Sequence, residues 1–211
     1  GGTGKTPLVI HLTKLLLKNG KKPGIVSRGY GRKSQGMIVV HDGNNLLSDV
    51  ITAGDEPYLL ARIFDNVPVV VCKDRSRGIR QLLDYDSINV IIMDDGFQHR
   101  KIKRDLDIVT VSANEKNEEY RLMPWGNLRE SLKNINRADL VIYTKTENYK
   151  TPAIHSKIKL KFKGNFINSS IVTVLMKYDT SGYHKTLTPD NPLFAFCGIA
   201  KPDSFFNYAM K

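Results

Sequence analysis

The chain has 211 residues, of which 41% are hydrophobic and 25% are charged, and these proportions are typical of a globular protein with a buried core. It contains no run of about 18 apolar residues, which excludes a membrane-spanning helix within this sequence. Its two distant cysteines, Cys72 and Cys197, exclude a disulfide framework and favour a reducing compartment. The net charge of +11 favours anionic partners such as nucleotides, nucleic acid, phospholipid head groups or phosphorylated sugars, although a basic solvated surface gives the same balance.

The first two thirds of the chain alternate between predicted helices and apolar strands. Pro7 suits the first turn of the first helix and Gly20 can end it. Helices are expected at 7–19, 55–64 and 76–83, and strands at 24–27, 37–41, 68–71, 89–93, 107–111 and 140–144. Because these strands lack strict alternation and are separated by helices, the pattern predicts an α/β fold with a mostly parallel sheet and helices on both faces.

The pattern changes after residue 146. Residues 157–162 alternate strictly between lysine and apolar side chains, which predicts a strand, and residues 171–176 form another β-type run. Residues 193–199 predict the first strand of a further α/β domain. The expected organisation is a core at 1–146, a β-hairpin linker region at 147–190 and the start of a second α/β domain at 191–211.

The opening sequence GGTGKTP is the strongest local signal. Its glycines allow backbone N–H groups to approach a polyphosphate, and the helix that follows points its positive end at the same place. Lys5 can reach the β- and γ-phosphates, and the Thr6 hydroxyl can bind Mg²⁺. The alternative is a glycine-rich turn before a helix. The nucleotide-binding candidates are Gly1, Gly2, Thr3, Gly4, Lys5 and Thr6.

A phosphate-binding loop normally follows a buried central strand, and no such strand precedes Gly1. The loss of that strand would leave backbone groups of the sheet unpaired. We therefore expect this chain to be a fragment of a longer protein.

Two adjacent carboxylates, Asp94 and Asp95, follow the predicted strand at 89–93. Ligands of open parallel sheets bind outside the carboxyl ends of the strands, where a phosphate-binding protein needs a carboxylate to organise its metal. Adjacent carboxylates also repel each other unless a cation offsets their charge. The two residues are thus candidate magnesium ligands, and the alternative is an Asp-Asp-Gly turn.

Three further charged groups lie where chemistry is expected. Asp55 starts a predicted helix and could take a proton from an attacking hydroxyl, although a helix cap is the simpler interpretation. Arg28 and Arg32 lie on a glycine-rich loop and suit a phosphate or a sugar, although an exposed basic loop has the same sequence. Arg75 follows an apolar strand and could offset charge on a phosphoryl group during transfer.

These motifs occur in an order that resembles the tetraacyldisaccharide 4′-kinase family. The residues that carry the resemblance are GGTGKTP at 1–7, SRGYGR at 27–32, GDEP at 54–57, DDGFQHR at 94–100 with Arg104-Asp105, MPWGNLRE at 123–130 and FCGIAKPDSFF at 196–206. The last of these departs from the family pattern at Ala200 and Lys201, where Gly-Asn is usual, and this departure weakens only the assignment of the hinge to the second domain.

The resemblance implies transfer of the ATP γ-phosphoryl group, with Mg²⁺, to the 4′-hydroxyl of a tetraacylated glucosamine disaccharide 1-phosphate, the lipid A precursor. It implies two α/β domains joined by a β-hairpin. It also implies a peripheral protein on the cytoplasmic face of the inner membrane, with any membrane helix placed before Gly1. We expect contact with an anionic membrane surface through the lysines of residues 157–163, no nucleic-acid partner and a monomer.

The resemblance also implies roles for single residues. Asp94, Asp95 and Glu130 would organise Mg²⁺ together with Thr6, and Asp55 would be the base for the sugar hydroxyl. The remaining candidates are Tyr30, Arg75 and Gln98 at the reacting centre and Arg28 and Arg32 at the acceptor. A partner histidine is expected beyond Lys211, and without it and the first strand we expect the 211-residue chain to be inactive.

Two other functions stay open from the sequence. One is a P-loop switch ATPase of the partition type, which shares the double-glycine loop and can bind DNA through basic surfaces. The other is a P-loop kinase for a soluble small molecule. ATP turnover that depends on an acceptor separates an enzyme from a switch, and a preference for acyl chains separates the two kinases.

Overall fold

The computed structural model describes residues 2–146, 151–170, 176–179 and 182–185. Contacts divide the chain into two compact units, one formed by Gly4–Asp107 and the other by Gly1–Thr3 with Ile108–Lys211. Each unit is built on its own sheet, and we describe the two in turn.

The unit Gly4–Asp107 holds a four-stranded sheet with the order β2-β3-β1-β4. The strands β1 (Pro23–Ser27), β3 (Val69–Val71) and β4 (Val90–Met93) are parallel, while β2 (Ile38–His41) pairs antiparallel with β3 at the edge. Because β1 lies between β3 and β4 and the three strands are parallel, the residues that follow them lie close together at the carboxyl ends of the strands.

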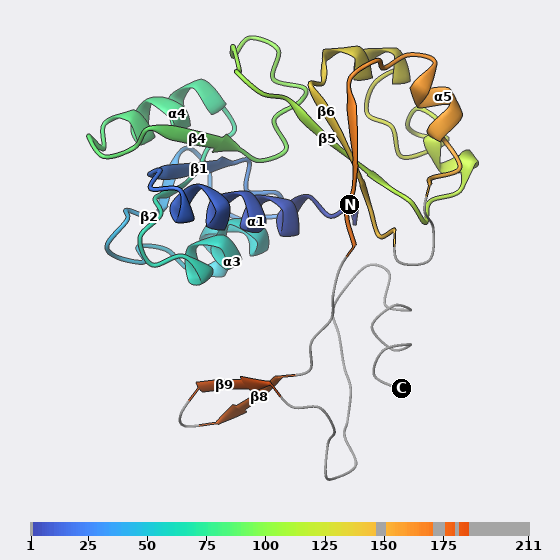
Figure 1. Ribbon diagram of the computed structural model, residues 1–211. Coiled ribbons are helices and arrows are strands. Elements are labelled where there is room, and N and C mark those ends of the chain that lie inside the picture. Colours follow the sequence, from blue (N-terminus) through green and yellow to red (C-terminus); the bar gives the residue numbers. More distant parts are fainter. Residues whose placement is uncertain (1, 147–150, 171–175, 180–181, 186–211) are drawn as a thin grey trace. The chain divides into compact units, whose positions relative to one another are not determined.

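Helices cover both faces of this sheet (Figure 1). Side chains alternate along β1, so that Ile25 packs in a cluster with α1 (Lys5–Lys18) and α3 (Asp55–Ile63), while Val26 packs with Leu82 of α4 (Arg75–Leu83) on the other face. The short α2 (Val50–Ala53) directly precedes α3. The predicted α/β fold with a mostly parallel sheet and helices on both faces is confirmed, and α1 begins two residues before the predicted start of its helix.

The second unit holds a parallel sheet of β5 (Ile108–Ser112), β6 (Leu140–Thr144) and β7 (Asn165–Asn168). Two 3₁₀ helices, η1 (Asn117–Tyr120) and η2 (Leu132–Arg137), lie between β5 and β6, and α5 (His155–Lys159) precedes β7. β8 (Met176–Asp179) and β9 (Gly182–Lys185) form an antiparallel pair, which shares only Met176 with the β-type runs predicted at 157–162 and 171–176.

The predicted strand at residues 157–162 is wrong, because the segment continues from α5 in helical turns. Ile158 and Phe162 are buried, and their spacing of four residues places them on one helical face, while Leu160 is 83% exposed. Phe162 packs edge-on against Phe166 of β7. Two apolar side chains four positions apart lie on one face of a helix and also on one face of a strand, so the alternation of these six residues does not distinguish the two structures.

An aromatic cluster packs between β6, α5 and β7 in the second unit. The hydroxyl of Tyr143 lies 2.6 Å from Nδ1 of His155, and both rings contact Phe166. Burial raises the pKa of Tyr143 to about 12. These contacts fix β7 against β6, so the parallel sheet continues beyond residue 146.

Several predictions fall on residues that the structure does not describe. Most of the run at 171–176, the strand at 193–199 and the whole segment 191–211 with Cys197 lie outside the described residues. The division into a core, a linker and a second domain therefore stays a prediction. Within the described residues, no helix is both long enough and apolar enough to cross a bilayer.

Candidate functional site

Four of the predicted site residues lie around the carboxyl ends of β1, β3 and β4. They are Lys5, Arg75, Asp94 and Asp95. The N–H of Asp94 donates to the carbonyl of Val26 at 2.9 Å, which continues the pairing of β4 with β1 by one residue. The Ser27 hydroxyl then donates to Oδ2 of Asp94 at 3.1 Å. Asp94 is thereby fixed at the edge of the sheet where ligands of such folds bind.

Asp94 is a buried carboxylate, only 5% exposed. Burial raises the pKa of Asp94 above its usual value, the Ser27 hydrogen bond offsets part of that rise, and the neighbouring charge of Asp95 adds to it. Lys5 and Arg75 act in the opposite direction. A carboxylate held in this way gains from any cation brought close to it.

Lys5 connects the start of α1 to these carboxylates. Its Nζ lies 3.7 Å from Oδ1 of Asp95, a residue with a left-handed backbone (φ 51°). Gly4, also left-handed at φ 80°, is the N-cap of α1, and no side chain in the described part of the chain caps this helix. The first N–H groups of α1 are therefore left for an anion, beside a lysine and within reach of the Thr6 hydroxyl in the same turn.

The chemistry of this group fits a magnesium ion bound together with phosphates. Asp94, Asp95 and the Thr6 hydroxyl are oxygen donors, and Mg²⁺ usually takes one or two carboxylates and completes its shell with water and phosphate oxygens. Among the described residues, no three or more His, Cys, Asp or Glu side chains gather into a metal-binding group. The site thus suits a metal that arrives with a polyphosphate better than a metal held by protein alone.

Arg75 is the buried cation of the site. Asp74 caps α4 through its side chain, which fixes Arg75 as the first residue of the helix, and the Arg75 side chain is only 1% exposed. Its Nη1 donates to the carbonyl of Cys72 at 2.7 Å, and within the described residues its Nε and Nη2 have no hydrogen-bond partner. Burial lowers the pKa of Arg75, while the carboxylates of Asp94 and Asp95 raise it.

Asp55 and Tyr30 line a separate depression of about 210 Å³ in the same unit. Its other lining residues are Gly31, Lys33, Val50, Ile51 and Gly54. The N-cap of α3 is Gly54, so Asp55 is the first residue of the helix and its carboxylate is exposed rather than used as a cap. The structure therefore shows that Asp55 does not cap α3, and its role as a base stays a prediction.

The loop that carries Tyr30 packs directly on the turn that carries Asp55. The N–H of Lys33 donates to the carbonyl of Ile51 at 3.0 Å. Both segments have left-handed glycines at the contact, and a Cβ at Gly29 would lie 2.9 Å from the carbonyl oxygen of Ala53, while one at Gly54 would lie 3.0 Å from that of Tyr30. Only glycine allows the two backbones to approach this closely.

Several predicted residues are engaged elsewhere or are simply exposed. Arg32 donates to Ser34 Oγ and to the carbonyl of Gly36, so its guanidinium holds its own loop. Arg28, Tyr30 and Gln98 are exposed, and Gly1 lies outside the described residues. Their roles at the acceptor or the nucleotide stay predictions.

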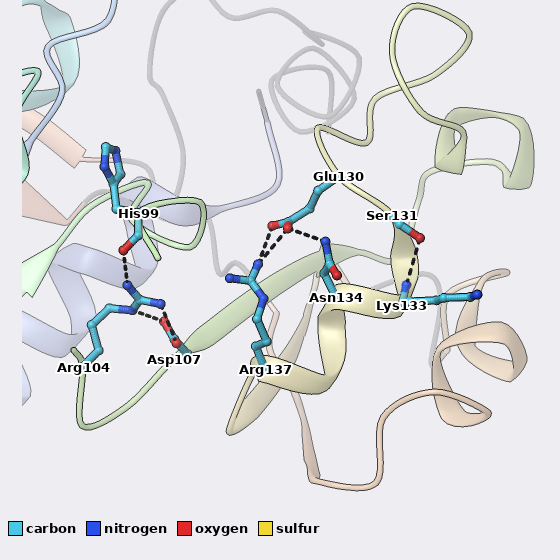
Figure 2. Close-up of polar contacts among 8 residues, drawn as sticks. All are labelled: His99, Arg104, Asp107, Glu130, Ser131, Lys133, Asn134 and Arg137. Carbon is cyan, nitrogen blue, oxygen red and sulfur yellow. Dashed lines mark hydrogen bonds and ion pairs between the residues drawn. The ribbon is translucent and has the colours of Figure 1, made fainter. Parts of the chain in front are cut away.

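Among the described candidates for binding phosphate or metal, Gly2, Thr3 and Glu130 belong to the second unit. The other candidates belong to the first unit. Thr3 is fixed to β5 and β6, because its hydroxyl accepts from Thr110 at 3.2 Å and its carbonyl from Thr144 at 2.9 Å. Figure 2 shows Glu130 with both oxygens bonded to Nη2 of Arg137, at 2.8 and 2.7 Å, and with Oε2 also bonded to Asn134 at 2.7 Å. A metal-binding role for Glu130 stays a prediction.

Three residues make contributions that the sequence analysis did not assign. Ser27, the hydrogen-bond donor to Asp94, becomes visible only once β1 is paired with β4. His99 lies near the site charges, and its pKa is lowered by burial and by the cations Arg75 and Arg28. Arg104 pairs with Asp107 rather than with the adjacent Asp105 of the motif.

Arg104 ties together the loop that follows Asp95 (Figure 2). Its Nε and Nη2 donate to the Asp107 carboxylate at 2.6 and 3.0 Å, and its Nη1 donates to the carbonyls of His99 and Ile102 at 2.6 and 2.9 Å. Both side chains of the ion pair are mostly buried.

We therefore expect Arg104→Ala to lower the free energy of unfolding by about 2 kcal/mol, because it removes hydrogen bonds to a mostly buried carboxylate and to two carbonyls. Urea unfolding followed by circular dichroism measures this change. Arg100→Ala, at an exposed position of the same loop, is the matched control. An equal loss in both variants would show that the Arg104 hydrogen bonds do not hold the loop.

Comparison with known proteins agrees with this geometry. The family described as tetraacyldisaccharide-1-P 4′-kinase matches residues 1–210. The chain belongs to the tetraacyldisaccharide 4′-kinase family. Curated tetraacyldisaccharide 4′-kinases that resemble it include those of Chlorobium luteolum, 38% identical over 100% of this chain and 61% of the relative, and Chlorobium chlorochromatii, 42% identical over 97% and 57%.

A crystal structure of LpxK from Aquifex aeolicus in complex with ATP has a similar fold, with a TM-score of 0.67 and 39% sequence identity. The match covers 85% of this chain and 52% of the Aquifex aeolicus chain. This member of the tetraacyldisaccharide 4′-kinase family therefore spans about three fifths of the curated relatives named above and about half of the solved structure.

Proposed function

We propose that the protein is a kinase that uses ATP and Mg²⁺ to phosphorylate the 4′-hydroxyl of a tetraacylated glucosamine disaccharide 1-phosphate, the lipid A precursor. The observation that carries the proposal is the group of Lys5, Asp94, Asp95 and Arg75 around the carboxyl edge of a parallel sheet, in a chain of this kinase family. Phosphoryl transfer asks mainly for positioning and charge stabilisation, and this group supplies both.

Each residue of the group has one task. The N–H groups at the start of α1 and the Lys5 ammonium would hold the ATP phosphates, and Asp94, Asp95 and the Thr6 hydroxyl would hold Mg²⁺, which would supply positive charge to the phosphate oxygens. The two unpaired nitrogens of Arg75 donate to charge that develops during transfer. Glu130, whose carboxylate accepts hydrogen bonds from Arg137 and Asn134, would be a further metal ligand.

The depression beside Asp55 suits the acceptor. Asp55 would accept the proton of the attacking hydroxyl, while Tyr30 and Gln98 would line the reacting centre. Arg28 would bind acceptor groups, and Arg32 would do so only through the N–H groups that it does not donate to Ser34 and Gly36. Val50 and Ile51 give the depression an apolar wall, as a lipid acceptor requires. A switch ATPase needs no such acceptor site, and family membership likewise favours the kinase over the partition-type alternative.

The proposal places the protein on the cytoplasmic face of the inner membrane as a peripheral monomer that contacts anionic lipid. The net charge of +11 supports this location. The exposed lysines at 157, 159 and 163 add to that charge, although Lys157 and Lys159 lie on the helix α5 instead of along one strand face. Charge reversal at positions 157, 159, 161 and 163 should weaken vesicle binding if these lysines take part.

Asp55→Asn should lower transfer to the acceptor by about 10²-fold or more, because the amide cannot take the proton of the hydroxyl. The assay follows label from γ-labelled ATP to a tetraacyl disaccharide 1-phosphate in detergent micelles with Mg²⁺, using the chain extended to the length of its curated relatives. Glu56→Gln, at the next exposed acid of the same helical turn, is the control and should retain activity.

The same assay separates the alternatives. ATP turnover without labelled lipid would support the switch ATPase and would make DNA binding the next measurement. Equal rates with an acceptor that lacks acyl chains would support a kinase for a soluble substrate.

A further inference from the structure

A turn at residues 121–129 lies between η1 and η2 and is closed by a parallel β-bridge between Leu122 and Leu128. Leu128 donates its N–H to the carbonyl of Arg121 at 2.9 Å, and Met123 donates to that of Leu128 at 3.0 Å. At the tip, the N–H of Trp125 donates to the carbonyl of Leu122 at 3.0 Å. The turn therefore holds its tip in a defined shape.

The tip exposes apolar side chains that a globular protein normally buries. Leu122 is 48% exposed, Met123 is 63% exposed and Trp125 is 78% exposed, and Pro124 between them is also exposed. Adjacent exposed side chains of this kind indicate a surface that another apolar phase covers.

Charge identifies that phase. Arg121 and Arg129 lie at the two ends of the turn, and both are exposed. Tryptophan prefers the boundary between lipid tails and head groups, and arginine is attracted to anionic head groups. An apolar tip with a tryptophan, bordered by two cations, matches the surface of an anionic bilayer more closely than it matches a protein interface.

We propose that the turn at residues 121–129 inserts its tip into the head-group region of an anionic bilayer, with Arg121 and Arg129 against the lipid phosphates. This inference names a part of the chain that makes the membrane contact proposed above, and it rests on that proposed function. Glu130 lies five positions after Trp125, and an extended chain of five residues spans at most about 18 Å. The insertion thus holds a proposed magnesium ligand close to the membrane in which the lipid acceptor lies.

The chain offers a direct probe, because Trp125 is its single tryptophan. With vesicles of phosphatidylglycerol and phosphatidylcholine we expect its emission to shift to shorter wavelength and to be quenched by lipids brominated on their acyl chains. Vesicles of phosphatidylcholine alone should produce a much weaker shift.

Two pairs of variants test the role of the arginines. Arg121→Gln with Arg129→Gln should weaken binding to the anionic vesicles about tenfold or more, since each cation near such a surface contributes to binding. Lys18→Gln with Lys21→Gln, at exposed positions that the proposal does not place at the membrane, removes the same charge elsewhere and should weaken binding less. Leu122→Ser with Met123→Ser should abolish quenching by the brominated lipids.

Three outcomes would overturn the proposal. The first is tryptophan emission that anionic vesicles leave unchanged, and the second is an equal loss of vesicle binding in the arginine and lysine pairs. The third is an emission shift that follows protein concentration without lipid, which would assign the tip to a second copy of the chain. If the 211-residue chain does not fold alone, Trp125→Ser in the extended chain, measured by co-sedimentation with the same vesicles, decides the question through a tenfold or greater loss of binding. The micelle kinase assay needs no bilayer, so a failure of this proposal and a failure of the kinase proposal are distinguishable.

Discussion

Lys5→Ala is expected to lower the rate of phosphoryl transfer by about 10²- to 10³-fold, the range found when one donor to transition-state charge is removed. Lys5 is the first residue of α1, and its Nζ lies 3.7 Å from Asp95, so one ammonium group serves both the phosphates and the carboxylate pair. The micelle assay with γ-labelled ATP measures the effect in the extended chain.

Lys14→Ala provides the matched control for this experiment, because Lys14 is an exposed lysine of the same helix. It should leave the rate within about twofold of the parent, as expected for a surface substitution away from the site. If Lys5→Ala retained full activity, the phosphate-binding role of the opening loop would be wrong, even though the fold is that of the family.

Asp94→Asn is expected to change activity and stability in opposite directions. Loss of a carboxylate that holds Mg²⁺ should lower the transfer rate by about 10²-fold or more. The same substitution should raise the free energy of unfolding by about 1 kcal/mol at neutral pH without Mg²⁺, because burial raises the pKa of Asp94 and the ionised form is thus a cost to the folded state.

The pH dependence of this gain has a definite sign. Because the pKa of Asp94 is higher in the folded than in the unfolded state, stability is lost as pH rises from the ordinary aspartate value through the folded one. The variant and the parent should therefore be equally stable below a pH of about 3.9 and should diverge above it. Urea unfolding in EDTA at several pH values measures the divergence.

Asp86→Asn is the control for stability, because Asp86 is exposed. It should not reproduce the gain. A loss of stability in Asp94→Asn at neutral pH would mean that the Ser27 hydrogen bond and the nearby cations more than compensate for the burial of the carboxylate.

The sheet of the first unit could be predicted from sequence because its strands are continuous apolar runs between helices. Alternation alone was not enough for residues 157–162, since Ile158 and Phe162 are spaced equally well for a helix and for a strand. β7 was missed because Asn165–Asn168 is short and half polar, and only its pairing with β6 makes it a strand.

The candidate site divides in the same way. The rule that ligands bind at the carboxyl ends of parallel strands placed Arg75 and Asp94 at one end of the sheet from sequence alone, whereas the strand order came from the structure. The partners of individual side chains could not be predicted, because they depend on rotamers and on register. The pairs Arg104 with Asp107 and Arg137 with Glu130 are contacts of this kind.

The contact between Gly29 and Gly54 limits how this protein can evolve. The loop with Tyr30 and the turn with Asp55 touch through backbone atoms, so a side chain added on either one displaces both. A lineage under selection for a new acceptor cannot adjust these two segments one mutation at a time. We expect successful variants from directed evolution to carry paired changes across this contact, and single changes at either glycine to be lost.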